Sequence, residues 1–181
     1  MINLHNKSLA DAANTEKRVF RKLSVEEAHL ANALADKTKH YGFKHWDEYY
    51  PTLEIFELDA AAGELFGCFV DEKLVSIITV SFSKEEIEDV LAVSAGIWSK
   101  ADKPSMLSRL CVDPDYRRMG IATFMMRQAA IQAGQMGADM LWLLVATDNA
   151  DAIGIYISLG YTKVGSVHIW DNDFYCYELS I

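Results

Sequence analysis

A chain of 181 residues that is 51% hydrophobic is long enough to bury the core of one domain and too apolar for a disordered protein. Its 17 Lys and Arg residues against 26 Asp and Glu residues leave a net charge of −9, which argues against general binding to nucleic acid or to anionic membranes. Any anionic ligand must therefore be held by a local cluster of donors.

Targeting segments, disulfides and metal sites are not expected in this chain. Residues 1–15 lack the uninterrupted apolar core of a secretory signal and are expected to form a loose arm before a single domain over residues 16–181. No apolar run approaches the roughly 20 residues of a membrane span. His40 and His45 lack further ligands, so no metal site is expected. Three cysteines, each in an apolar stretch, predict reduced core thiols of a cytoplasmic protein: Cys68, Cys111 and Cys176.

The first part of the chain predicts a strand and a helix. Residues 17–23 are typical of a strand. Ser24 followed by Glu27 resembles a capping box, in which the two side chains bond free N–H groups at a helix start. The helix is expected to run to His40, and an aromatic-rich connection over residues 40–51 follows.

The next part predicts a second helix, a hairpin and an acidic connection. Pro51 begins the helix at a position that proline tolerates, and Gly63 ends it. The apolar runs 64–70 and 74–80 flank three turn residues, which predicts an antiparallel hairpin. The acidic segment 83–103 is too long for a plain hairpin loop.

A strand, a helix and a second strand follow. Residues 106–112 and 140–146 predict the strands, and the continuous apolar run of the second fits a sheet covered on both faces. Strands joined in this way by a helix should be parallel. The helix, residues 119–137, is predicted by apolar residues at helical spacing, namely Ile121, Met125, Ala129, Ala133 and Met136.

The chain closes with a short helix and another hairpin. Asp148 or Asn149 can cap the helix, and Gly160 ends it. Residues 161–170 and 174–180 form the hairpin. The elements together predict an α/β fold in one domain, with a mixed and mostly antiparallel sheet, a central parallel strand pair and helices on both faces.

The turn between the strand and the long helix has features of an anion site. Arg117 and Arg118 stand directly before a helix N-terminus, which already carries about half a positive charge from aligned peptide dipoles. Asp113 and Asp115 soften this repulsion but do not explain it. A phosphate or pyrophosphate would explain it, whereas the simpler interpretation is a solvated arginine pair.

Small residues in the same turn favour the anion. Gly120 and Ala122 leave room for a bulky ligand to approach the free N–H groups of the first helical turn. The arginines would then add charged hydrogen bonds. No Gly-x-x-x-x-Gly-Lys-Ser/Thr and no Gly-x-Gly-x-x-Gly sequence is present, which argues against a nucleoside triphosphate and a dinucleotide.

Two motifs resemble those of the GNAT superfamily of N-acetyltransferases. Arg117-x-x-Gly120-x-Ala122 is similar to its acetyl-CoA signature, Arg/Gln-x-x-Gly-x-Gly/Ala. A second motif resembles its downstream Asn…Tyr…Gly-Phe pattern, Asn149-x-x-Ala152-x-x-x-Tyr156-x-x-x-Gly160-Tyr161. The resemblance is strongest over residues 106–165. It implies a GNAT-like fold and acetyl-CoA as co-substrate.

The resemblance also implies where acetyl-CoA would bind. Its pyrophosphate would lie on the turn made by Arg117, Arg118, Met119, Gly120, Ile121 and Ala122. If strands 106–112 and 140–146 splay apart, the pantetheine arm would pair like an extra strand with the backbone of Leu110, Cys111 and Val112. Asn149 would be a polar contact to the arm. Tyr156 would be the general acid that protonates the leaving thiolate, a role compatible with core packing of its ring.

The acceptor and its general base are not singled out by the sequence. An alkylamine, with a pKa of about 10, must lose a proton before it attacks. His168 and Glu178 could take that proton. The acidic connection could attract a cationic amine or simply form a solvated face through Glu85, Glu86, Glu88 and Asp89.

Two further features have open interpretations. Arg109 interrupts an apolar strand, and it either pairs with a structural carboxylate or binds a substrate carboxylate. The aromatic residues of the first connection either wall an acceptor pocket or cover the sheet: Tyr41, Phe43, Trp46, Tyr49 and Tyr50.

The sequence therefore predicts an acetyl-CoA-dependent N-acetyltransferase that acts on a primary amine of a small molecule or peptide. Direct transfer in a ternary complex is preferred over an acetylated Cys111, since no histidine lies nearby in sequence to activate that thiol. A non-catalytic acyl-CoA-binding module and a structural or partner-binding domain are the alternatives. The identity of the acceptor and the choice between a monomer and a homodimer are left open.

Overall fold

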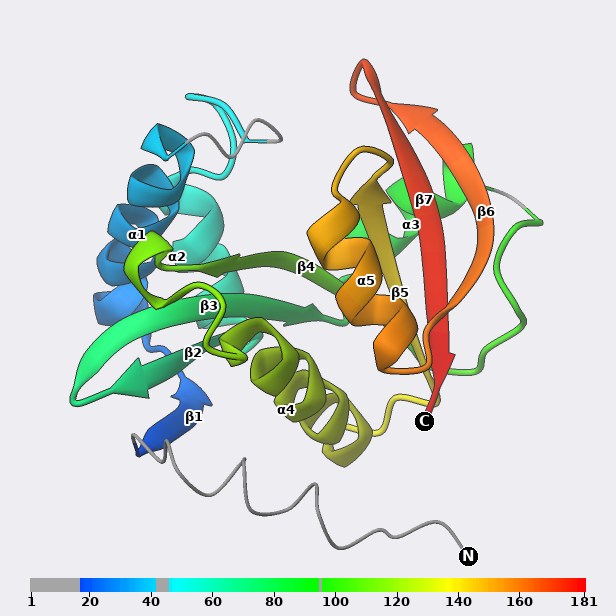
Figure 1. Ribbon diagram of the computed structural model, residues 1–181. Helices are drawn as coiled ribbons and strands as arrows, with labels where there is room; N and C mark the ends of the chain where they lie inside the picture. The colour runs from blue at the N-terminus through cyan, green and yellow to red at the C-terminus, as the bar shows by residue number, and fades with distance from the viewer. Residues whose placement is uncertain (1–16, 42–45, 95) are drawn as a thin grey trace, which may run out of the picture.

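Seven strands form one sheet in the order β1-β2-β3-β4-β5-β7-β6 in the computed structural model, which describes residues 17–41, 46–94 and 96–181 (Figure 1). The strands are β1 (Arg18–Lys22), β2 (Leu65–Val70), β3 (Lys73–Ser81), β4 (Pro104–Val112), β5 (Met140–Ala146), β6 (Thr162–Ile169) and β7 (Asn172–Ser180). β4 and β5 run parallel, and every other neighbouring pair is antiparallel. The predicted mixed sheet is thus confirmed, whereas the predicted N-terminal arm lies outside the described residues.

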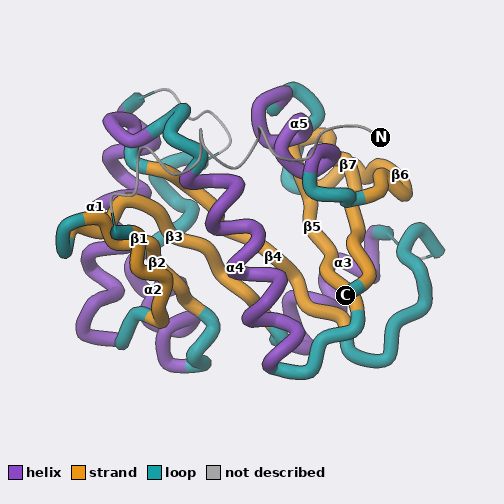
Figure 2. Tube along the Cα trace, turned by 60° about the horizontal axis from the view of Figure 1, so that its bottom comes forward, coloured by secondary structure: helices purple, strands orange, loops and turns teal. Residues whose placement is uncertain are grey.

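Helices cover both faces of this sheet (Figure 2). They are α1 (Ala28–His40), α2 (Leu53–Ala61), α3 (Lys84–Val93), α4 (Ile121–Gln135) and α5 (Ala150–Ser158), with short 3-10 turns η1 (Val25–Glu27) and η2 (Pro114–Tyr116). α4 and α5 pack on one face, where Met125 and Tyr156 join a core with residues of β2, β3, β4 and β5. α1 and α2 pack on the other face through Leu34 and Phe56.

Local signals explain most element boundaries. Asp71 and Glu72 have φ angles of 47° and 67°, the left-handed conformation that a tight two-residue turn needs, and they join β2 to β3. Ser24 donates its backbone N–H to Glu27 Oε2 at 3.0 Å, which supports the predicted capping box. Gly63 follows α2 with a φ of 71°, as expected of a glycine that ends a helix.

Two predicted helix starts were wrong by a few residues. α2 begins at Leu53, because Thr52 is the N-cap and its side chain accepts the N–H of Ile55 at 3.5 Å. Pro51 therefore lies before the cap. α4 begins at Ile121, because Gly120 adopts a φ of 74° that is incompatible with a helical position.

The acidic connection 83–103 contains a helix that was not predicted, α3. Ser83 caps α3 by accepting the N–H of Glu86 at 3.4 Å. The apolar side of the helix buries Val90 against Met106 and Trp142. α3 thereby covers the place where β4 and β5 meet, on the same face of the sheet as α2.

Candidate functional site

β4 and β5 separate along their length and leave an opening in the middle of the sheet. Their pairing is Pro104 with Met140, Ser105 with Leu141 and Met106 with Trp142. Beyond Met106, β4 remains paired with β3, and β5 remains paired with β7. β4 and β5 therefore diverge from each other (Figure 1). The β4 backbone of residues 107–112 therefore has no strand partner on this edge, within the described part of the chain. An extended ligand could pair there as an added strand.

A bulge at Arg109 interrupts β4 inside the opening. Ile77 pairs with Cys111, but Thr79 pairs with Ser108, so β4 has one residue more than β3 in this stretch. Arg109 has a φ of 54°, which is uncommon for a residue with a side chain. The bulge changes the course of β4 directly before Leu110, the first residue expected to contact the pantetheine arm.

The Arg109 side chain is held by a carboxylate of α2. Its Nε and Nη2 atoms donate to Asp59 Oδ2 at 2.7 Å and Oδ1 at 3.0 Å. Thr79 also donates to Asp59 Oδ2, and Tyr50 accepts from Arg109 Nη1 at 3.1 Å. The two charged side chains are only 8% and 10% exposed. Burial raises the pKa of Asp59, and Arg109 opposes part of that rise. Of the two interpretations of Arg109, the structural ion pair is the one observed.

The turn before α4 is open to a ligand. A Cβ built on Gly120 would meet nothing closer than Arg18 Nη1 at 4.0 Å. No side chain caps this helix, so the first N–H groups of α4 are free to bind an anion. Arg117 and Arg118 are exposed beside them. This arrangement offers an anion both backbone and side-chain donors.

The acidic residues of the turn do not neutralise its arginines. Lys37 Nζ lies 2.6 Å from both Asp113 Oδ1 and Asp115 Oδ2, and Lys73 Nζ lies 3.1 Å from Asp113 Oδ2. Both aspartates are therefore paired with lysines, and neither forms an ion pair with Arg117 or Arg118 within the described part of the chain. The positive charge of Arg117 and Arg118 remains available at the helix N-terminus.

Arg18 is a third cation at this turn, and it was not among the residues expected there. It lies on β1, and its Nη2 donates to the carbonyl of Met119 at 2.6 Å across 101 positions of sequence. Its guanidinium also lies 5.9 Å from the centre of the Phe124 ring on α4. No local pattern could have indicated this contact, because it depends on where β1 joins the sheet.

Asn149 and Tyr156 both belong to α5. Asn149 caps the helix, since its Oδ1 accepts the N–H of Ala152 at 3.2 Å, and its Nδ2 has no partner among the described residues. Tyr156 is 8% exposed and packs near Tyr161 and Tyr177, with ring centres 5.8 and 6.2 Å away. Burial raises the pKa of Tyr156 to about 12. The ring is thus a core residue, and its hydroxyl stays protonated at neutral pH.

Cys111 is poorly suited to carry an acyl group. Its side chain is buried on the α1 and α2 side of β4, and burial raises the pKa of its thiol to about 12. The thiolate that a nucleophile requires is therefore scarce at neutral pH. Its neighbours Leu110 and Val112 pack on the opposite face, towards α4 and α5.

The residues expected near the acceptor are scattered. Glu85, Glu88 and Asp89 are exposed on α3. His168 Nδ1 lies 2.8 Å from Asp173 Oδ1. Glu178 accepts hydrogen bonds from the backbone N–H and the hydroxyl of Ser99. No general base is therefore identified among the described residues.

The aromatic residues of the first connection, for which a pocket wall and a cover for the sheet were both open, do not form one group. Tyr50 contacts Arg109, and Trp46 packs against the core beneath α1 and α2. Tyr41 and Tyr49 are exposed. Phe43 lies outside the described residues.

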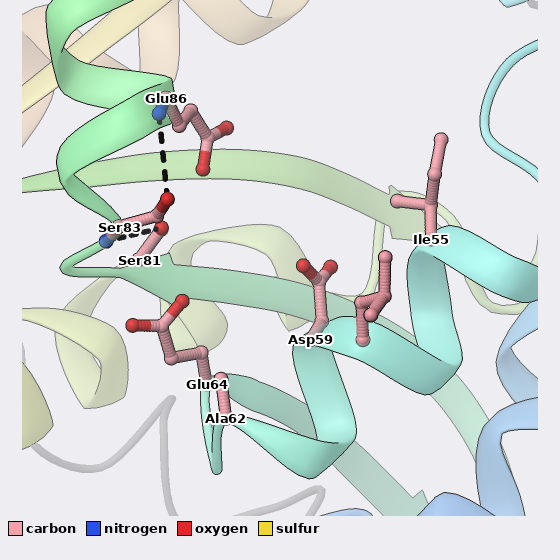
Figure 3. Close-up of a pocket in the computed structure, with 8 residues that line it drawn as sticks. Ile55, Asp59, Ala62, Glu64, Ser81, Ser83 and Glu86 are labelled. Atoms are coloured by element: carbon pink, nitrogen blue, oxygen red, sulfur yellow. Dashed lines mark hydrogen bonds between the residues drawn. The ribbon is translucent and has the colours of Figure 1, made fainter.

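Glu86 lines a pocket on the face of the sheet that α2 and α3 cover (Figure 3). The pocket has a volume of about 280 Å³, and α2, the end of β3 and the start of α3 enclose it. Its lining residues are Ile55, Leu58, Asp59, Ala62, Glu64, Ser81, Ser83 and Glu86. Across the described residues, no group of acidic, histidine or cysteine side chains is arranged to hold a metal ion. None of the helices described is both long and apolar enough to span a membrane.

The sequence is similar to known acetyltransferases. Residues 28–161 match the Acetyltransferase (GNAT) family. The ribosomal protein bS18-alanine N-acetyltransferase of Escherichia coli strain K12 is 37% identical over 57 residues, and the match covers 32% of this chain and 38% of that protein. The corresponding protein of Salmonella typhimurium strain LT2 is 35% identical over 57 residues, again 38% of its length.

Solved structures share the fold over almost the whole chain. A GNAT-family acetyltransferase from Streptococcus agalactiae 2603 has a TM-score of 0.72 at 20% identity, covering 91% of this chain and 95% of that one. The ribosomal-protein-S18-alanine N-acetyltransferase of Escherichia coli has a TM-score of 0.66 at 19% identity, covering 91% and 94%. The PaiA N-acetyltransferase of Thermoplasma acidophilum, solved in complex with coenzyme A, has a TM-score of 0.68 at 16% identity, covering 91% and 99%.

Proposed function

Because the chain belongs to the Acetyltransferase (GNAT) family, we propose that it transfers the acetyl group of acetyl-CoA to a primary amine of a small molecule or peptide. The observation that carries the proposal is the opening between β4 and β5, next to an arginine-rich helix N-terminus. A strand edge and an anion site in this arrangement suit a ligand with an extended arm and a pyrophosphate.

The pyrophosphate is proposed to bind the turn before α4. Donors there are the free N–H groups of the first turn and the guanidinium groups of Arg117 and Arg118. The pantetheine arm would pair with the β4 backbone at Leu110, Cys111 and Val112. Asn149 would donate to the arm through Nδ2, the amide group that its capping bond leaves free. Met119, Ile121 and Ala122 would contribute backbone groups to the same surface, and the small side chain of Ala122 would keep the approach open.

The reaction is proposed to proceed by direct attack. The neutral amine nitrogen attacks the acetyl carbonyl carbon, a C–N bond forms, the C–S bond breaks, and the amine loses one proton while sulfur gains one. Tyr156 would donate a hydrogen bond and then its proton to the departing sulfur. A thiol, with a pKa of about 8.5, is a stronger acid than this tyrosine, so the transfer must be coupled to loss of the amine proton.

Binding and transfer can be tested separately. Acetyl-CoA at 100 times its dissociation constant should stabilise the protein by about 2.7 kcal/mol, which a thermal-shift measurement detects. A panel of alkylamines, amino acids and peptides, one of them with an N-terminal alanine, should then release free thiol in a transfer assay. Stabilisation without transfer to any amine would instead indicate a non-catalytic acyl-CoA-binding module. Absence of stabilisation would contradict the proposal.

A further inference from the structure

We propose that the acceptor carries a second cationic group and that the pocket between α2, β3 and α3 binds this group. The inference rests on the proposed function, since it assigns the acceptor class of the same site. An alkyl diamine is the simplest acceptor of this kind.

The pocket contains more negative charge than the protein neutralises. Asp59 of α2, Glu64 of the turn before β2 and Glu86 of α3 line it (Figure 3). Arg109 is the cation next to them, and it pairs closely with Asp59 but lies 3.5 Å from Glu86 Oε1. One arginine is therefore shared between the carboxylates of Asp59 and Glu86.

Glu64 has no cationic partner among the described residues. Its Oε1 accepts the backbone N–H of Phe82 at 2.7 Å, whereas its second carboxylate oxygen forms no hydrogen bond there. The residue is only 9% exposed. This second oxygen is not among the buried unpaired side-chain atoms of the described residues, so it is accessible to a ligand. An ammonium group that enters the pocket could donate a charged hydrogen bond to it.

The shape and the walls of the pocket favour an organic cation. The three carboxylates do not form a group that could hold a metal ion. Ile55, Leu58 and Ala62 of α2 provide an apolar wall. A volume of about 280 Å³ accommodates a small ligand. An ammonium group on a methylene chain matches both the carboxylates and the apolar wall.

The position of the pocket fits an acceptor. Asp59 lines the pocket and also forms the ion pair with Arg109, the residue directly before Leu110 on β4. The pocket therefore adjoins the strand segment proposed to bind the pantetheine arm, on the face opposite α4 and α5. A molecule held there by one amine can extend a second amine towards the opening.

The inference can be tested by calorimetry on the full chain in the presence of coenzyme A. The affinities of two matched probes, 1,4-diaminobutane and butylamine, are compared. The diamine should bind at least about tenfold more tightly than the monoamine, the effect of one charged hydrogen bond. Glu64→Gln should remove this preference while keeping the bond from Phe82. Glu57→Gln, an equal charge change on the exposed side of α2, should keep it.

Each outcome decides the inference. Equal binding of the two probes, an unchanged preference in Glu64→Gln, or displacement of the diamine by Mg²⁺ would overturn it. The comparison of the diamine with the monoamine uses the wild-type protein. It therefore tests the inference even if the Glu64→Gln protein folds poorly. If acetyl-CoA acetylates monoamines but the diamine binds no more tightly than the monoamine, the inference fails and the proposed function stands. If no amine is acetylated, the proposed function fails, and the binding comparison still decides the pocket.

Discussion

Gly120 is the residue at which the proposed anion site is most sensitive to substitution. Gly120→Glu should abolish coenzyme A binding, because it adds a negative charge beside the free N–H groups of α4. Any side chain at a φ of 74° is strained, so the matched control is Gly120→Gln, which has the same size and the same strain. We expect a much larger loss of affinity for the glutamate variant in calorimetry. Equal affinities in two folded variants would remove this turn from the site.

The hydroxyl of Tyr156 can be separated from the packing of its ring. Tyr156→Phe keeps the ring, so turnover should fall by about 10²–10⁴-fold, the usual contribution of a positioned general acid, while acetyl-CoA affinity changes little. Steady-state kinetics and calorimetry measure the two quantities. Wild-type turnover in the folded variant would eliminate the proton-donor role.

Tyr161 provides the matched control for this prediction. Its hydroxyl is buried and has no hydrogen-bond partner among the described residues. Tyr161→Phe removes an unsatisfied polar group, so the free energy of unfolding should rise by about 1 kcal/mol and turnover should stay close to that of the wild type. Chemical unfolding measures the first effect. A destabilised Tyr161→Phe protein would show that this hydroxyl has a partner after all.

The pKa of Tyr156 also predicts a pH profile. Because burial raises this pKa to about 12, the protonated form that acts as donor persists through the neutral and mildly basic range. The amine must lose its proton, and its pKa is about 10. For an alkylamine acceptor, kcat/KM should therefore rise with pH towards about 10 and should not fall through ionisation of Tyr156 below about pH 11. A falling limb near pH 8–9 in a stable protein would contradict this assignment.

At the scale of the element, the bulge of β4 combines an unusual backbone conformation with a buried ion pair. Arg109→Ala and Arg109→Gly both leave Asp59 without its partner, which should cost about 3–5 kcal/mol of stability. Glycine adopts a φ of 54° without strain, so the glycine variant should be more stable than the alanine variant by roughly 0.5–1 kcal/mol. Chemical unfolding compares the two. An alanine variant as stable as the glycine variant would show that the backbone there is not left-handed.

At the scale of the whole molecule, the two substrates are proposed to approach from different faces of the sheet. The anion site lies at the start of α4, and the acidic pocket lies beneath α2 and α3 on the other face. Both ligands could then be bound at once. We expect intersecting lines in initial-rate kinetics with varied acetyl-CoA and amine, and no acetylated protein by mass spectrometry. Parallel lines with an acetylated Cys111 would contradict direct transfer.

Patterns that are local in sequence predicted most of the fold and part of the site. Apolar runs between turn residues identified the strands, and helix caps, helix-ending glycines and helical spacing identified four helices, because each of these signals lies within a few neighbouring residues. The turn at residues 117–122 and a cap at Asp148 or Asn149 were also recognisable, since helix ends need particular residues at fixed positions, and the structure shows that Asn149 is the cap. α3 was missed, because its charged residues hid the few apolar positions, among them Val90, that it buries.

The tertiary structure decided which distant residues meet. Arg109 pairs with Asp59, which is 50 positions away in the sequence, and Lys37 pairs with Asp113, which is 76 positions away. Neither partner could be chosen from the sequence, because several carboxylates were available and the register of the sheet selects among them. The same holds for Glu64, whose burial depends on how α2, β3 and α3 enclose a single pocket. Periodic backbone structure is encoded within a few neighbouring residues, whereas the charge balance of a site depends on packing between elements far apart in the chain.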